Sequence, residues 1–271
     1  MVTPVDAAEA ERRRQGWRDF FAGGGLWEMR YSPERWAEIV RRNVVTAVVM
    51  IAAAALLVAL LWWWGRLGPL VLGGVLALAM VVYALMALHR RAMLLAQSGG
   101  EPGVVLGVSD HGVHTSVRGI GTVPWSDVLG AFIVDEHEKV DAIRARRGLQ
   151  GAAARFAAKN GAECIHVNVI VSDGKAMKRR IAGRAHRRFV QTWAHHDGPQ
   201  FGVLSFGIDS ATDQSDPASM PRLALALTVQ CEDRGLPTRI DSDATRFDEH
   251  MMRLSNVFDY SSVDAKEAGA A

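Results

Sequence analysis

Two long apolar runs stand out from an otherwise mixed pattern of hydrophobic and polar positions. Residues 44–64 and residues 70–88 contain no charged side chain. At about 1.5 Å per residue, either run is long enough as a helix to cross the roughly 30 Å hydrocarbon core of a bilayer. Because only residues 65–69 separate the two runs, the pattern predicts a tight antiparallel hairpin of two transmembrane helices within residues 44–91.

Two other interpretations of these runs are disfavoured. A cleaved signal peptide begins with a short basic region, whereas about forty residues precede the first run. A pair of buried helices in a soluble protein would need enough surrounding chain to cover helices that are apolar on all sides. Both runs lack charged groups, which line most transport paths, so a transporter or channel is also disfavoured.

The residues that flank the two runs predict an orientation. Basic side chains gather at the outer ends of the hairpin, and only Arg66 lies in the connection. By the positive-inside rule, both chain ends face the cytoplasm, and the three tryptophans before the connection lie at the opposite headgroup layer. The predicted membrane-interface residues are Arg41, Arg42, Arg90, Arg91, Trp62, Trp63 and Trp64.

The polar segment 1–43 carries a helix-start signal, with Ser32 as the capping residue and Pro33 at the first helical position. Trp36, Ile39 and Val40 recur at helical spacing after it. This predicts either a short amphipathic helix against the membrane or a simple extension of the first span, and the pattern does not separate the two.

Short apolar runs between turn residues predict a mostly antiparallel β-domain over residues 98–240, after a linker at residues 97–103. The expected strands flank a turn at residues 109–112, end at Trp125, and run over residues 128–135, 139–145, 163–173 and 201–208. Residues 179–195 and 219–235 are expected to be helices, and residues 146–162 a short helix or a loop. The alternation of Leu223, Leu225, Leu227 and Val229 would also fit a strand in the second of these segments. An acidic, partly disordered tail is expected over residues 241–271.

One family shares this arrangement of segments. The pre-membrane stretch MRYSPERWAEIVRRN, two spans, and a β-rich domain with VSDHGV at residues 108–113 and VPWSDV at residues 123–128 resemble the YcxB-like family of bacterial membrane proteins. The resemblance covers roughly residues 28–190. It implies a pleckstrin-homology (PH)-like barrel or sandwich with a C-terminal helix, on the cytoplasmic side of a bacterial inner membrane, and it brings no catalytic residues.

A block of basic residues lies in this domain, although the chain has a net charge of only +2. Residues 142–208 contain twelve Lys and Arg against three acids, while residues 209–271 contain twelve acids against six bases. The block could be a solvated face paired with the acidic tail, a contact for anionic lipid, or a weaker candidate for nucleic acid, since interleaved aromatics are missing. Its residues are Lys175, Lys178, Arg179, Arg180, Arg184, Arg187 and Arg188.

Catalytic and metal-binding patterns are weak in this chain. Cys164 and Cys231 are far apart, and His111 with His114 flank a turn, so neither pair predicts a metal site. A nucleophile elbow and a phosphate-binding loop are both missing from the sequence. Asp135, Glu136, His137 and Glu138 are expected to form a solvated loop at a strand end.

These patterns favour a multi-pass inner-membrane protein with both termini in the cytoplasm. Its domain is expected to bind anionic lipid or a protein partner, and that partner could be a second copy of the chain. No enzyme activity, cofactor or metal is expected, and nucleic acid is disfavoured. The alternative is a membrane-anchored enzyme or regulator with its active part in residues 200–271.

Overall fold

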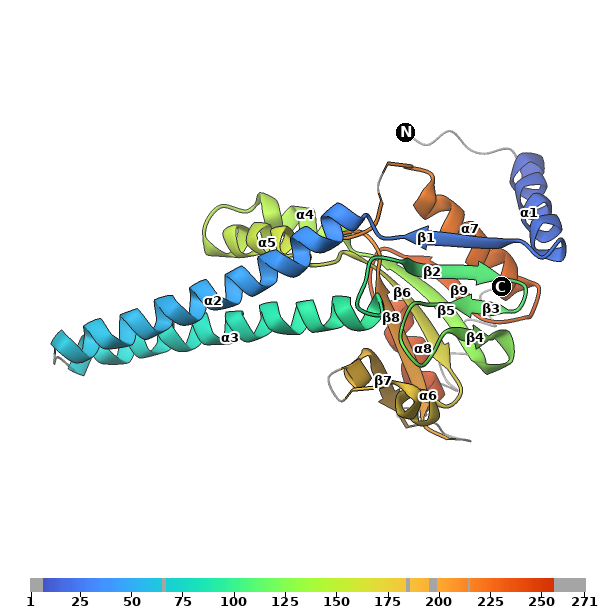
Figure 1. Ribbon diagram of the computed structural model, residues 1–271. Coiled ribbons are helices and arrows are strands. Elements are labelled where there is room, and N and C mark those ends of the chain that lie inside the picture. The colour runs from blue at the N-terminus through green and yellow to red at the C-terminus, as the bar shows by residue number, and fades with distance from the viewer. Residues whose placement is uncertain (1–6, 65–66, 184–185, 195–198, 214, 256–271) are drawn as a thin grey trace.

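The computed structural model describes residues 7–64, 67–183, 186–194, 199–213 and 215–255. A long helical hairpin projects from one side of an α+β domain (Figure 1). The hairpin consists of α2 (Pro33–Trp64) and α3 (Leu67–Gln97). Both helices are long and apolar enough to cross a membrane, and only 17% of the most apolar stretch of α2 and 22% of that of α3 is buried. The core helices of a soluble protein would be mostly buried, so these exposed apolar surfaces support association with a membrane.

The helix that begins at Pro33 continues to Trp64 as α2. Ser32 Oγ accepts a hydrogen bond from the N–H of Arg35 at 3.4 Å, as its capping position predicts. Ile39 is buried in the core of the domain, and Trp36 packs against the same core. The second interpretation of this segment therefore holds: the first turns of α2 extend the apolar helix and fix its root in the domain.

One end of the domain is a four-stranded antiparallel sheet in the order β1-β2-β3-β4. Its strands are β1 (Leu26–Arg30), β2 (Val104–Ser109), β3 (Gly112–His114) and β4 (Thr122–Pro124). The turn predicted between β2 and β3 is present. The sequence interpretation missed β1, which pairs with β2 so that Trp27 lies opposite Val108. The hairpin is thus inserted between two neighbouring strands.

A second sheet has five strands in the order β7-β8-β6-β5-β9. The strands are β5 (Val128–Asp135), β6 (Ile165–Val171), β7 (Val190–Trp193), β8 (Phe201–Gly207) and β9 (Thr238–Asp241). They are antiparallel except for the parallel pair β5 and β9. In the described part of the chain, β1, β4, β7 and β9 are edge strands, so neither sheet closes into the predicted barrel.

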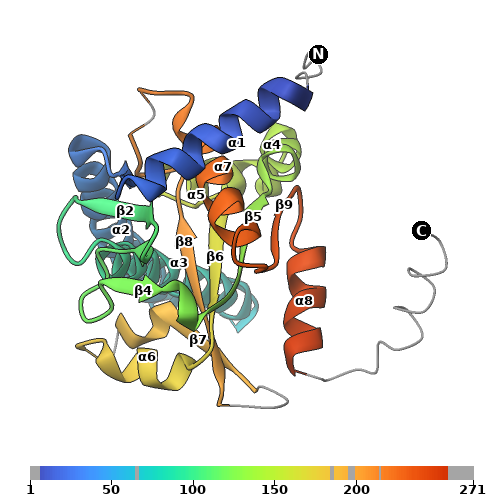
Figure 2. The ribbon, with the colours of Figure 1, turned by 90° about the vertical axis from the view of Figure 1, so that its right-hand side faces the viewer.

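Helices cover both faces of the five-stranded sheet (Figure 2). On one face, α7 (Ser219–Glu232) buries Leu223 and Leu227 in the main core and packs against α1 (Ala7–Ala22). On the other face, α8 (Thr245–Ser255) buries Met251 against Phe132 and Ile170. The helix α8 lies within the acidic tail and was not expected from the sequence; the disorder expected at the end of the tail falls within residues 256–271, which lie outside the described part.

Two further expectations need correction. The expected strand over residues 139–145 is the helix α4 (His137–Ala145), because Val140 and Ile143 have the i, i+3 spacing of one helical face. The expected linker is a packed joint, because Ser98 is buried and Gln97 Nε2 donates to the carbonyl oxygen of Gly207 at 2.9 Å. Residues 146–162 do contain one of the two expected structures, the helix α5 (Leu149–Lys159).

The C-terminal stretch is part of the same domain. β8 lies between β7 and β6 in the second sheet, and α7 fills the core against both sheets. Residues 200–255 therefore share their core with the rest of the domain. They do not fold as a separate unit behind it.

Candidate functional site

The predicted basic block forms an exposed surface beside the edge strand β7. Its described residues lie on α6 (Gly174–Arg180) and on the 3₁₀ helix η2 (His186–Phe189). We call this surface the basic face; it comprises Lys175, Lys178, Arg179, Arg180, Arg187 and Arg188. Arg184 lies outside the described residues.

The single helix expected over residues 179–195 is wrong. α6 ends at Arg180, and the chain then passes through η2 into strand β7, which pairs with β8. The i, i+4 spacing of Ile181, Ala185, Phe189 and Trp193 in the sequence suggested a helix, but Gly183, with φ +89°, interrupts it. The basic residues consequently lie on two short elements that present them around one corner of the domain.

Local chemistry fixes α6 to the sheet. Asp173 caps the helix, because its carboxylate accepts a hydrogen bond from the N–H of Ala176 at 2.7 Å. Gly174 lies so near the backbone of Gly202 that a Cβ atom there would be 2.4 Å from the Gly202 Cα. Met177 is buried on the inner side of α6. The apolar side of the helix is held against the sheet, and its charged side is turned to solvent.

The described part of the chain shows no acidic partner for the basic face, in contrast to several arginines elsewhere in the domain. Among the described residues, none of its six side chains forms an ion pair. Elsewhere Arg144 pairs with Asp141 at 2.9 Å, and Arg234 pairs with Asp110 at 2.6 Å. The helix α8, which carries part of the acidic tail, packs on the opposite face of the sheet from α6. The described part of the tail therefore leaves the basic face unneutralised.

One side of the basic face touches the helical hairpin. η2 packs against α3. Arg188 borders a hollow whose other residues all come from α3: Val82, Leu85, Met86, Leu88, His89, Ala92 and Met93. These residues include the end of the apolar run and the first positions after it, so the basic face lies beside the root of the hairpin.

The other predicted interface residues lie at the two ends of the hairpin. Trp62 and Trp63 are 82% and 87% exposed near its tip, and the side chain of Trp64 lies outside the described residues. At the root, Arg41 is exposed, and Arg42 Nη1 donates to the carbonyl oxygen of Lys159 at 2.7 Å. Arg90 and Arg91 are half-buried on α3.

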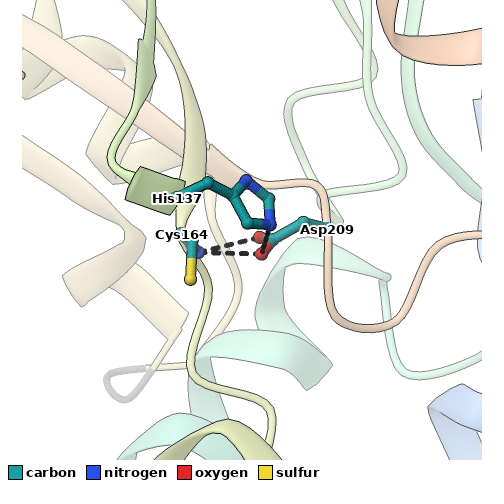
Figure 3. A group of neighbouring side chains, drawn as sticks. All are labelled: His137, Cys164 and Asp209. Atoms are coloured by element: carbon teal, nitrogen blue, oxygen red, sulfur yellow. Dashed lines mark hydrogen bonds and ion pairs between the residues drawn. The ribbon is translucent and has the colours of Figure 1, made fainter. Parts of the chain in front are cut away.

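A second polar cluster combines residues that are far apart in the sequence. His137, Cys164 and Asp209 have potential ligand atoms within 4.8 Å of one another (Figure 3). His137 begins α4 and lies near two carboxylates, with Nδ1 at 3.0 Å from Asp135 and Nε2 at 3.8 Å from Asp209. The predicted solvated loop around His137 is therefore wrong, because the chain turns there into α4 and brings the imidazole to the end of β8.

The chemistry of this cluster is that of a structural clamp. The carboxylate of Asp209 accepts the N–H groups of Cys164 at 2.9 Å and Ile165 at 3.1 Å. Glu163 in turn accepts the N–H groups of Asp209 at 3.0 Å and Ser210 at 2.7 Å. These reciprocal bonds join the start of β6 to the end of β8. Figure 3 shows the sulfur of Cys164 turned away from the imidazole.

Protonation in the clamp also follows from burial. Burial, and then the hydrogen bond and charge of Asp209, raise the pKa of Glu163 well above its usual value. Burial alone would raise the pKa of Asp209, but the bonds from Glu163 and from two N–H groups outweigh it and lower the pKa. The opposite directions make Glu163 the member of the pair that takes up a proton first as pH falls. Burial raises the pKa of Cys164 to about 11, so the sulfur stays a thiol and is a poor metal ligand near neutral pH.

The histidine of the first sheet, His114, has structural partners. His114 Nε2 is 2.7 Å from the hydroxyl of Ser109, and its Nδ1 is 3.0 Å from that of Thr122. Both ring nitrogens are thus engaged in fixing the β2–β3–β4 meander. His195 and His196 lie outside the described residues.

The fold defines a class of protein: an α+β domain with two open sheets and a long apolar helical hairpin inserted between its first two strands. Comparisons of the chain with models of known families, with curated proteins and with solved structures find no match.

Proposed function

We propose that this chain is a membrane-anchored binding module whose basic face contacts anionic lipid headgroups on the cytoplasmic side of a bacterial inner membrane. The observation that carries the proposal is the position of six basic side chains, without acidic partners among the described residues, beside the root of an apolar hairpin. A contact of this kind needs no catalytic groups.

The proposed topology follows from charge and exposure. Both helices cross the membrane, and both chain ends lie in the cytoplasm because Arg41, Arg42, Arg90 and Arg91 surround the root of the hairpin. The exposed rings of Trp62 and Trp63 support a headgroup position for the tip. The domain then lies against the inner leaflet, whose surface is negatively charged.

The energy available for this contact is substantial. A Lys or Arg near an anionic leaflet contributes about 1 kcal/mol, so four engaged side chains of the basic face would contribute about 4 kcal/mol. Arg187 and Arg188 are exposed and lie on η2, the element of the basic face that packs against α3. Because the hairpin already keeps the domain at the surface, this energy would select lipids and orient the domain.

We also propose that the chain is YcxB-like and that its domain is a distant, open relative of the PH-like type. The two stretches that carry the resemblance are in contact, since Trp125 Nε1 donates to the carbonyl oxygen of Ser109 at 2.9 Å. Trp125 is buried, and the guanidinium carbon of Arg234 lies 5.2 Å from its ring centroid. Shared residues in the VSDHGV and VPWSDV stretches thus support a shared folding core.

The test uses the full chain, because β1 and α2 form part of the domain. The protein is reconstituted into phosphatidylcholine vesicles that contain trace spin-labelled phosphatidylglycerol or spin-labelled phosphatidylcholine. Electron spin resonance then gives the selectivity of the protein for the anionic lipid. We expect a preference for phosphatidylglycerol that falls towards none when Lys178, Arg179, Arg180 and Arg187 are changed to Ala.

A matched control removes the same charge elsewhere. Arg12, Arg222, Arg239 and Arg246 are exposed and lie outside the basic face, so changing these four to Ala should leave the lipid preference intact. An equal loss of lipid preference in both variants would mean that the preference depends on net charge and not on the basic face. No preference in the unchanged protein would overturn the proposal and would direct the search to a protein partner.

A further inference from the structure

Helices α4 and α5 form a second helical pair beside the root of the hairpin (Figure 1). Three polar contacts join the end of α5 to α2. Asn43 Nδ2 donates to the carbonyl oxygen of Asn160 at 2.9 Å, and Thr46 Oγ1 donates to Asn160 Oδ1 at 3.0 Å. Arg42 Nη1 donates to the carbonyl oxygen of Lys159 at 2.7 Å. These contacts fix the height of α5 along the hairpin.

That height coincides with the inner boundary of the bilayer. From Trp63, near the tip, to Thr46 is about 25 Å along α2 at 1.5 Å per residue, against roughly 30 Å of hydrocarbon. The ring of Phe156 on α5 lies 5.3 Å from the ring of Tyr83 on α3, and Tyr83 is inside the apolar run 70–88. α5 therefore reaches the level where acyl chains meet headgroups.

The surface of α5 has an apolar stripe that is exposed at one end and reaches α3 at the other. Leu149, Ala153 and Phe156 recur at i, i+4 and i+7, the spacing of one helical face. Leu149 is 90% exposed, more than Trp63 at the tip of the hairpin with 87%, and Phe156 is 38% exposed. Figure 1 shows the loop between α4 and α5 on the side that faces the far end of the hairpin.

Basic side chains surround this stripe. Arg146 and Arg147 precede α5 in the loop, and Arg155 and Lys159 lie on the helix. All four are exposed, and none forms an ion pair among the described residues. An apolar stripe with Lys and Arg along its borders is typical of helices that lie in a membrane interface. Long cationic side chains can extend from such a helix to the phosphate layer.

We propose that the α4–α5 pair is a second membrane contact, in which Leu149 and Phe156 enter the acyl–headgroup boundary of the same leaflet. The occupant of the exposed stripe is lipid, because the stripe continues the apolar surface of α3 through the contact of Phe156 with Tyr83. The inference rests on the topology proposed above. It does not rest on the lipid selectivity of the basic face, because an apolar contact forms equally with zwitterionic lipid.

The test labels the full chain at position 149 after the substitution Leu149→Cys. The native Cys164 and Cys231 are buried, and burial raises their pKa values to about 11 and about 12, so a thiol-reactive NBD fluorophore labels the introduced cysteine selectively. The labelled protein is placed in nanodiscs of phosphatidylcholine alone. We expect emission at shorter wavelength than in water, and strong quenching by lipid that carries a nitroxide near its headgroup.

Ile240→Cys is the matched control, because Ile240 is 56% exposed on β9, away from the hairpin. It should show water-like emission and little quenching by the nitroxide lipid. Ala153→Cys gives a second position on the stripe, where the side chain changes little in size. Water-like emission at both position 149 and position 153 would overturn the inference. A blue shift without quenching by lipid would also overturn it, because protein would then cover the stripe.

The two experiments fail independently. If the unchanged protein shows no preference for anionic lipid but the label at position 149 is quenched, the proposed function of the basic face is wrong and the second membrane contact stands. If the lipid preference is present but the emission at positions 149 and 153 is water-like, the second contact is wrong and the proposed function stands.

Discussion

The side-chain amide of Asn43 in α2 donates a hydrogen bond to the main-chain oxygen of Asn160, 2.9 Å away beyond the end of α5. Both residues are 0% exposed. Asn43 Nδ2 also contacts the carbonyl oxygen of Ile39 at 2.9 Å within α2. One amide group therefore fastens the helical hairpin to the domain at the point where α2 leaves the protein core.

Removal of this amide should loosen the joint. Asn43→Ala leaves the buried oxygen of Asn160 without its donor from α2, which typically costs about 1–3 kcal/mol of unfolding free energy. Thermal unfolding of the full chain in detergent micelles measures the loss. Val45→Ala is the control on the same helix, because Val45 is 54% exposed to the surroundings. Equal unfolding temperatures for the two variants would contradict the role of the amide.

The clamp predicts a pH dependence of stability. Because the pKa of Glu163 is raised in the folded chain, the folded state holds a proton that the unfolded state releases. Its contribution to stability is fully present below the ordinary carboxyl pKa and is lost as pH rises through the raised value. Glu163→Gln imitates the protonated form, so unfolding at increasing pH should show a flatter curve. An unchanged slope would refute a proton held on Glu163.

Asp209, the second carboxyl group of the clamp, has a lowered pKa and accepts hydrogen bonds as a carboxylate. Oδ1 of Asp209 accepts the N–H groups of both Cys164 and Ile165, and Oδ2 also accepts that of Cys164 at 3.0 Å, so the amide nitrogen of an Asn side chain at Oδ2 would face a hydrogen-bond donor. Asp209→Asn should therefore lower the unfolding free energy by about 1–3 kcal/mol, and by more than Glu163→Gln, because the raised pKa of Glu163 favours the neutral form that Gln imitates. Denaturant titration of both variants makes the comparison, and equal losses would count against the assigned proton.

The position of α6 depends on a glycine in the β3–β4 connection. Gly119 has φ +91°, and a Cβ atom there would lie 2.1 Å from the carbonyl oxygen of Arg180. Gly121 has φ +64° with no atom within 4 Å, so Gly121→Ala carries the backbone strain alone. Both variants should lower the free energy of unfolding by about 1 kcal/mol or more. Gly119→Ala should have the larger effect, because its Cβ atom also clashes with Arg180. A hydrogen-exchange increase over residues 174–180 should appear in Gly119→Ala only.

The domain should not fold without the segments that precede the hairpin. A fragment of residues 98–271 lacks β1, which pairs with β2, and it lacks Phe21, Met29 and Ile39 of the main core. Circular dichroism of aromatic side chains and dye binding should show a loosely packed state. A cooperative unfolding transition in this fragment would contradict the insertion described above.

The sequence predicted those parts of the fold in which near neighbours along the chain decide the structure. The uncharged runs predicted two long helices, and alternation around Val167 and Val169 predicted β6. Mixed patterns were misleading where tertiary packing decides: Ile181 and Phe189 have helical spacing, yet β8 pairs with residues 190–193 as a strand. The strand β1 was missed because its partner lies beyond the hairpin.

The site was predictable to a similar degree. A run of basic residues in the sequence is a local signal, so the basic face was found, but its place beside α3 depends on packing. The clamp was missed because Glu163 and Asp209 are separated by 46 positions in the sequence. A single acidic residue in a sequence does not by itself indicate a partner. The exposed stripe of α5 could have been found from Leu149, Ala153 and Phe156, had the segment been assigned as a helix.

The insertion of the hairpin between β1 and β2 imposes an order on biosynthesis. β1 emerges from the ribosome first, but its hydrogen-bonding partner follows only after both apolar helices have been made. At about 5–20 residues per second, the strand waits for several seconds, during which α2 and α3 can enter the lipid. With the topology proposed above, insertion of the hairpin is therefore complete before the first sheet forms. The pairing of β1 with β2 then closes the domain around the root of the hairpin as a late step of folding.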